Sequence, residues 1–100
     1  MNRITKKEAI KTIAEAKKIN KIFLGLKTEN ELIKKSLINN ENIIIDNMKK
    51  AEIKLNSNSI KTQESYLYFR DIKEAYFIQL EKIKSVIIKT ECNIIIYNII

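Results

Sequence analysis

Few residues in this chain of 100 amino acids have the side chains that catalysis normally needs. There is no histidine, which is the commonest proton shuttle at neutral pH and a common zinc or iron ligand. The single cysteine, Cys92, therefore has no histidine to activate it, and the residues that follow it in the sequence are mostly apolar. We expect Cys92 to be buried and unreactive, with an intermolecular disulfide or a redox switch as the alternative.

Other kinds of chemical site have equally little support. The carboxylate pairs Asp71 with Glu74 and Glu29 with Glu31 are of a kind that helix surfaces produce by chance, and neither has the Glu-x-x-His spacing of a metal site. Phosphate-binding loops need several glycines, whereas Gly25 is the only glycine in the chain. A single cysteine excludes an internal disulfide and a cysteine-based zinc site. We therefore expect a protein that is not an enzyme, with no cofactor, no metal site and no small-molecule substrate.

Basic residues are concentrated at the start of the chain. Residues 1–35 contain ten Lys or Arg against four acidic residues, and the whole chain carries a net charge of +7. On a helical wheel, one face carries five of these cations: Arg3, Lys7, Lys11, Lys18 and Lys21. Such a face could lie along a phosphate backbone and bind nucleic acid in a salt-sensitive way. The alternative is a solvated helix face in a lysine-rich protein.

Aromatic residues are concentrated between residues 66 and 77. Tyr and Arg dominate the energetics of many protein interfaces because they combine a large contact area with hydrogen bonding. On a helical wheel Leu67 lies away from the apolar stripe and Tyr68 lies beside it, so we expect Leu67, Tyr68 and Arg70 at the surface. The other predicted interface residues lie on or after the same segment: Ile78, Ile95, Ile96, Tyr97, Ile99 and Ile100.

The elements that position these residues are predicted to be helices. The chain has no proline and one glycine, so it lacks the residues that usually form hairpin turns. Ile, Lys and Asn make up half of the chain and have A/T-rich codons, which suggests that Ile often occupies sites where Leu would serve and weakens its usual preference for strands. We therefore predict an all-α fold, a small antiparallel three-helix bundle or coiled-coil-like arrangement with a long central C-terminal helix.

Apolar residues recur at helical spacing in three segments. We expect helices at about residues 4–24, 29–55 and 60–97 within a single domain. The first should end at Gly25, which enters a left-handed conformation without a Cβ penalty, and a capping box at 28–31 should start the second.

Two parts of this prediction remain open. The asparagine-rich stretch 39–42 could break the second helix, which would give four helices. After Ile94 the apolar residues point to all sides of a helical wheel, so the segment could be a buried helix or a short strand that starts near Asn93. We prefer a helix, because a lone strand would have no partner in an all-α chain.

The excess apolar surface of the third segment predicts protein–protein interaction, either as a homodimer or with another protein. Small phage or mobile-element inhibitors and adaptors have this profile, as do small subunits of larger assemblies. Nucleic-acid association through the first helix is the alternative. The longest uncharged stretch, nine residues, is about half a membrane span, and the first residues contain no apolar run of a signal peptide. We therefore expect no membrane partner and a cytoplasmic location, the host cytoplasm if the protein is phage-encoded.

Overall fold

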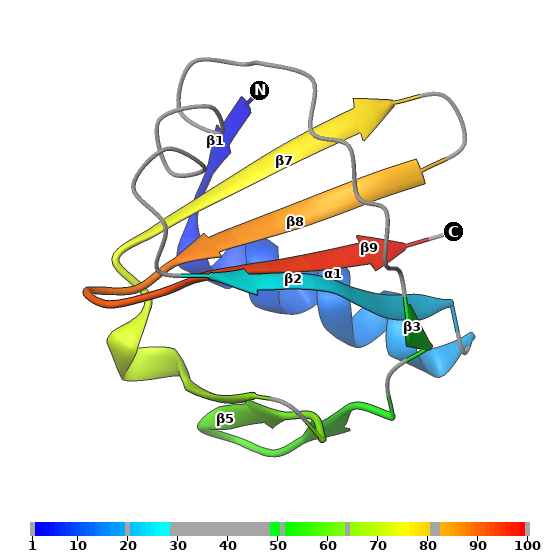
Figure 1. Cartoon of the computed structure of the whole chain (residues 1–100), viewed down its shortest axis with the longest axis horizontal. Helices are drawn as coiled ribbons and strands as arrows, with labels where there is room; N and C mark the ends of the chain where they lie inside the picture. Colours follow the sequence, from blue (N-terminus) through cyan, green and yellow to red (C-terminus); the bar gives the residue numbers. More distant parts are fainter. Residues whose placement is uncertain are drawn as a thin grey trace.

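The computed structural model describes residues 2–19, 21–28, 49–50, 52–63, 65–80 and 83–99. Within these residues, antiparallel strands form two sheets, and one α-helix packs against the larger sheet (Figure 1). The larger sheet has the strand order β1-β7-β8-β9-β2-β3, and the smaller sheet has the order β4-β5-β6. The elements in chain order are β1 (Asn2–Ile4), α1 (Lys6–Lys18), β2 (Ile22–Thr28), β3 (Lys49–Lys50), β4 (Lys54–Leu55), β5 (Ser59–Lys61), β6 (Tyr66–Tyr68), the 3₁₀ helix η1 (Phe69–Asp71), β7 (Glu74–Leu80), β8 (Ile83–Lys89) and β9 (Ile94–Ile99).

The prediction of an all-α bundle with a long C-terminal helix is wrong. Strands β5 to β9 occupy the segment predicted as the helix 60–97, and the described part of the segment 29–55 contains β3 and β4. The possible break at 39–42 lies outside the described residues. Short apolar runs fit buried strands as well as helices, and β-branched Ile packs well on a pleated sheet. Isoleucine therefore shows its usual preference for strands in this chain, and the argument that its A/T-rich codons weaken that preference is wrong.

The apolar C-terminal run forms an interior strand of the larger sheet and not the end of a helix. Strand β9 pairs with β8 on one side and with β2 on the other, so that Tyr97 lies opposite both Val86 and Leu24. All six residues of β9 are buried. The strand has partners because the rest of the chain is itself a sheet. The tail is thus covered within one chain, which removes the argument that its apolar surface needs a partner.

Thr, Ser and Asn side chains close three hairpin turns, whose described residues include no glycine or proline. In the turn 56–59, the Asn56 Oδ1 accepts hydrogen bonds from the backbone N–H groups of Asn58 and Ser59 at 2.9 and 2.8 Å. In the turn 62–65 the N–H of Ser65 donates to the Thr62 hydroxyl at 3.0 Å, and the turn 90–93 uses a threonine in the same way. These side chains replace backbone hydrogen bonds in turns, a role open to Asn, Ser and Thr.

Helix α1 is shorter than the predicted helix 4–24. It begins with a capping box in which the Thr5 hydroxyl accepts the Glu8 backbone N–H at 3.1 Å and Glu8 reaches back to the Thr5 backbone. It ends at Lys18, whereas Gly25 lies in β2, where the pairing with β9 shifts register. No helix among the described residues is long and apolar enough to cross a membrane.

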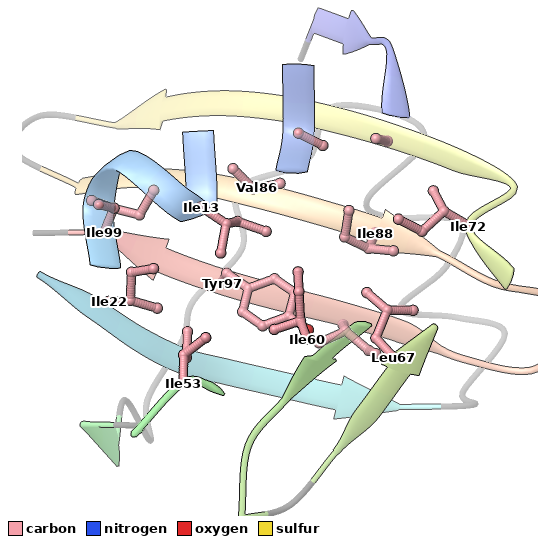
Figure 2. Packing of buried hydrophobic residues seen from close by; sticks show 14 residues of the cluster. Ile13, Ile22, Ile53, Ile60, Leu67, Ile72, Val86, Ile88, Tyr97 and Ile99 are labelled. Carbon is pink, nitrogen blue, oxygen red and sulfur yellow. The ribbon is translucent and has the colours of Figure 1, made fainter. Parts of the chain in front are cut away.

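The main hydrophobic core lies on one face of the larger sheet. Ala9, Ile13 and Ala16, which are spaced four and three residues apart and so share one face of the helix, are the buried residues of α1. Figure 2 shows α1 and the smaller sheet on the same side of the larger sheet, with Ile60 and Leu67 reaching toward Tyr97. The smaller sheet is therefore fixed to the larger one by its inward face, and its outward face is left for solvent.

Candidate functional site

The outward face of the smaller sheet carries a cluster of aromatic and cationic side chains. The rings of Tyr66 and Tyr68 lie 4.7 Å apart between centroids. The Lys61 Nζ lies 5.7 Å from the centroid of the Tyr66 ring, and the Arg70 Cζ lies 4.8 Å from that of Tyr68. We call these four residues the aromatic–cation stack. Both distances allow cation–π attraction, so each ring already contacts a cation and the other ring.

The pairing of β5 with β6 places the stack on one face. Lys61 lies opposite Tyr66, and Ser59 lies opposite Tyr68. Successive side chains of a strand point to opposite faces, so Leu67 points inward while its two neighbours point outward. Tyr66 and Tyr68 are 48% and 37% exposed, whereas Leu67 is 2% exposed.

The base of the stack is held by buried neighbours. Ile60 and Leu67 belong to the main core, which ties the hairpin of β5 and β6 to the larger sheet. Ser59 is buried beneath the outward face, and its hydroxyl donates to the Asn56 Oδ1 at 3.0 Å. The Arg70 guanidinium lies 3.8 Å from the Asp71 carboxylate, and both side chains are exposed. The exposed rings therefore stand on a fixed platform.

The two tyrosines are coupled electrostatically. Hydrogen bonding to Ser59 and then to Tyr68 lowers the pKa of Tyr66. The same interaction with Tyr66 raises the pKa of Tyr68. Opposite directions are expected when the Tyr68 hydroxyl donates to the Tyr66 oxygen. The two tyrosines therefore influence each other's ionisation as well as packing together.

The structure brings together only part of the predicted interface. Tyr68 and Arg70 lie side by side on the exposed face, whereas Leu67 is buried and does not have its expected exposure. Ile78 is half-buried on β7. The described tail residues of the predicted interface are all buried in β9: Ile95, Ile96, Tyr97 and Ile99. Ile100 lies outside the described residues.

Two members of the stack were missed by sequence reasoning. Neither Lys61 nor Tyr66 is among the predicted interface residues. The alternation Tyr66-Leu67-Tyr68 was the available signal, because in a strand it places both tyrosines on the face opposite Leu67. A helix would have turned the two rings well apart.

The five predicted basic residues do not share one helix. Lys7, Lys11 and Lys18 lie on α1 and are exposed, whereas Arg3 lies on β1 and Lys21 lies between α1 and β2. At 100° per residue the three lysines of α1 fall within a narrow stripe. The basic face is therefore smaller than predicted, but it is present.

The remaining reactive groups do not assemble into a catalytic site in the part of the chain that the structure describes. Cys92 is exposed in the turn between β8 and β9, so the prediction of a buried thiol is wrong. Glu74 accepts a hydrogen bond from the Tyr76 hydroxyl, which lowers the pKa of Glu74 and raises that of Tyr76. Among the described residues no group of three His, Cys, Asp or Glu side chains could hold a metal ion.

Similarity to known proteins gives no information on the role of this surface. The chain matches no family model, no curated protein sequence and no solved structure.

Proposed function

We propose that this protein is a non-enzymatic binding module whose partner is another protein, and that the partner contacts the aromatic–cation stack. The observation that carries the proposal is the exposure of Tyr66 and Tyr68 between two cations, on a sheet whose other face is fixed in the core. Tyr and Arg are the residue types most enriched among the strong contributors to protein interfaces.

The pre-formed arrangement of the stack supports binding. Ordering a flexible side chain at an interface costs free energy that a side chain already held in place does not lose again. Arg70 lies over the Tyr68 ring and near Asp71, and Tyr66 lies against Tyr68 and beneath Lys61. The same contacts make base stacking less favourable, since a nucleobase would have to displace a cation or a ring to reach an aromatic face. A protein partner can use the hydroxyls, the ring edges and the charges as they stand.

A capture experiment tests the proposal. Tagged protein with Tyr68→Ala and Arg70→Ala should lose, by at least tenfold, a partner that wild-type protein retains from native host extract. The matched control is Ile19→Ala, because Ile19 is another exposed large apolar residue, 61% exposed, and lies at the end of α1. Equal capture by all three proteins would contradict the proposal. The solution mass of the purified protein tests whether the partner is a second copy of this chain, since a homodimer would have twice the mass of the monomer.

A cytoplasmic site of action is part of the proposal. Cys92 is exposed and lies in a chain with no other cysteine, and free surface thiols persist in reducing compartments. For a phage-encoded protein, this compartment would be the host cytoplasm, and its role that of an inhibitor or adaptor of a host protein.

Nucleic-acid association is the second candidate, and the stripe of Lys7, Lys11 and Lys18 on α1 favours it. Binding should be independent of sequence and should weaken steeply between low and moderate salt. The variant with Lys7→Glu and Lys11→Glu should lose it, while Lys73→Glu with Lys84→Glu, which has the same net charge, should retain it. Equal loss in both variants would show a response to net charge alone and would contradict a site on α1.

A further inference from the structure

Strand β6 has an open edge beside the stack. Among the described residues it pairs with β5 alone. The backbone bonds Thr62 N–H to Ser65 O, at 2.8 Å, and Phe69 N–H to Asn58 O, at 2.9 Å, fix the alternation of the ladder. Since bonded and non-bonded pairs alternate in an antiparallel ladder, Leu67 bonds to β5 while the backbone groups of Tyr66 and Tyr68 point away from it. Tyr66 and Tyr68 therefore contribute both the aromatic rings of the stack and the outward N–H and C=O groups of the edge.

This edge borders a pocket that is open to solvent. The pocket has a volume of about 260 Å³ and lies between Tyr66 and Leu67 and the turn from Thr90 to Asn93, which includes Glu91. Asp71, Lys73 and Ile95 complete its lining. Unpaired strand edges accept an additional strand from a partner, whose backbone bonds give affinity while alternate side chains give specificity. The pocket provides space along β6 for such a strand.

We propose that the partner binds as an extended, acidic protein segment that adds to the edge of β6 and places its carboxylates near the cations of the outward face. This inference rests on the proposed function and specifies the chemistry and conformation of the partner. The segment pairs with the outward N–H and C=O of Tyr66 and with the N–H of Tyr68. Its side chains on the outward face continue the row that β4, β5 and β6 begin.

The charges of that row select an acidic segment. Lys54 lies opposite Lys61, and Lys61 lies opposite Tyr66, so two exposed lysines and a tyrosine stand side by side across the three strands. Arg70 adds a third cation and Lys73, in the lining of the pocket, a fourth, so the cations outnumber the two nearby carboxylates of Asp71 and Glu91. A second copy of this chain would bring the same cations and a net charge of +7 to the contact, which disfavours it as the occupant.

A pair of variants at one position separates the backbone contact from the side-chain contact. Tyr68 has φ −81° and ψ 136°, which a proline can adopt, and its N–H makes no bond to β5. Tyr68→Ala and Tyr68→Pro both remove the ring, but only the proline variant removes the outward N–H. The probe is a soluble peptide of alternating threonine and glutamate, titrated into isotope-labelled protein and followed by amide chemical shifts. Amide spectra of the free variants verify that each one folds.

The peptide should shift the amides of β6 in the wild-type protein, and the proline variant should bind about fivefold more weakly than the alanine variant, the equivalent of one net hydrogen bond. A threonine–lysine peptide should not bind. Equal affinities of the two variants, both weaker than wild type, would overturn strand addition while supporting the stack as the contact. No shift in the wild-type protein at millimolar peptide would also overturn it, and the capture experiment would then judge the proposed function separately. Binding of oligothymidylate at the stack in place of the peptide would overturn both.

Discussion

Replacing Tyr97 with Phe should stabilise the fold, because this tyrosine buries a hydroxyl without a hydrogen-bond partner. Its side chain is 0% exposed and lies between the larger sheet and the smaller one, close to Ile60 and Leu67 (Figure 2). Ser65 is the polar neighbour that affects its titration, but the Ser65 hydroxyl already shares a hydrogen bond with Thr62 at 2.9 Å. Among the residues that the structure describes, the Tyr97 oxygen has no hydrogen-bond partner.

The expected gain follows from the cost of an unpaired buried polar group. Leaving a hydroxyl unsatisfied in a protein interior costs about 1–3 kcal/mol, and Phe fills the volume of the ring without opening a cavity. We expect the free energy of unfolding to rise by about 1 kcal/mol. For a domain of this size such a change raises the melting temperature by about 4–8 °C. Urea unfolding followed by circular dichroism at neutral pH measures it directly.

Alkaline pH should enlarge the difference between the two proteins. Burial raises the pKa of Tyr97 well above its ordinary value, and Ser65 opposes this only in part. The folded state therefore keeps the proton while the unfolded state releases it near pH 10, so this residue's contribution is fully present below that pH and is lost as pH rises above it. Wild type should lose about 1.4 kcal/mol per pH unit above the ordinary pKa through Tyr97, and the Phe variant should not.

The matched control is Tyr76→Phe, which removes a hydroxyl that donates to Glu74. It should leave stability unchanged or lower it slightly. The reasoning about Tyr97 is refuted if Tyr97→Phe lowers the free energy of unfolding by about 1 kcal/mol or more, since that result would mean that the hydroxyl has a satisfied partner in solution. A gain that does not grow with pH would refute the titration argument alone.

Three further predictions concern separate parts of the fold. Thr5→Ala removes the capping hydroxyl of α1 and should cost about 1 kcal/mol in urea unfolding, whereas an unchanged midpoint would show that the capping box adds nothing. Ile96→Ala should cost about 2–5 kcal/mol because Ile96 is fully buried in β9, while Ile19→Ala should stay within about 0.5 kcal/mol; similar losses would contradict the burial pattern. Cys92 should react rapidly with a thiol reagent in the native protein, and Cys92→Ser should leave the melting temperature unchanged; slow reaction without denaturant would contradict its exposure.

The sequence contained enough information for α1 but not for the sheets. The buried face of α1 follows from helical spacing. The start of α1 follows from the capping box of Thr5 and Glu8, which the prediction of a helix from about residue 4 did not take into account. Isoleucine is so frequent that helical spacing can be found by chance along almost any segment, including β8 and β9. Spacing alone therefore could not distinguish a helix from a buried strand.

The missing glycine and proline were the second source of error. They were taken to exclude hairpins, yet the described turns use Asn56, Thr62 and Thr90 to accept backbone N–H groups. The sequence carries that signal in polar clusters such as Asn56-Ser-Asn-Ser59, which separate apolar runs. Turn chemistry supplied by side chains is harder to see because the same residues also cap helices.

Only part of the candidate site was predictable, because which side chains share a face depends on whether the segment is a helix or a strand. In a helix, Tyr66 and Tyr68 would point about 160° apart, and Arg70 would lie beside Tyr66 and away from Tyr68. In a strand the two rings share a face, and the register with β5 adds Lys61 opposite Tyr66. In the strand Leu67 is buried, and the exposed face therefore carries the aromatic and cationic side chains of the stack. In a helix the backbone N–H and C=O groups of these residues would bond to one another along the helix. In the edge strand β6 the outward N–H and C=O groups are left to form a contact surface.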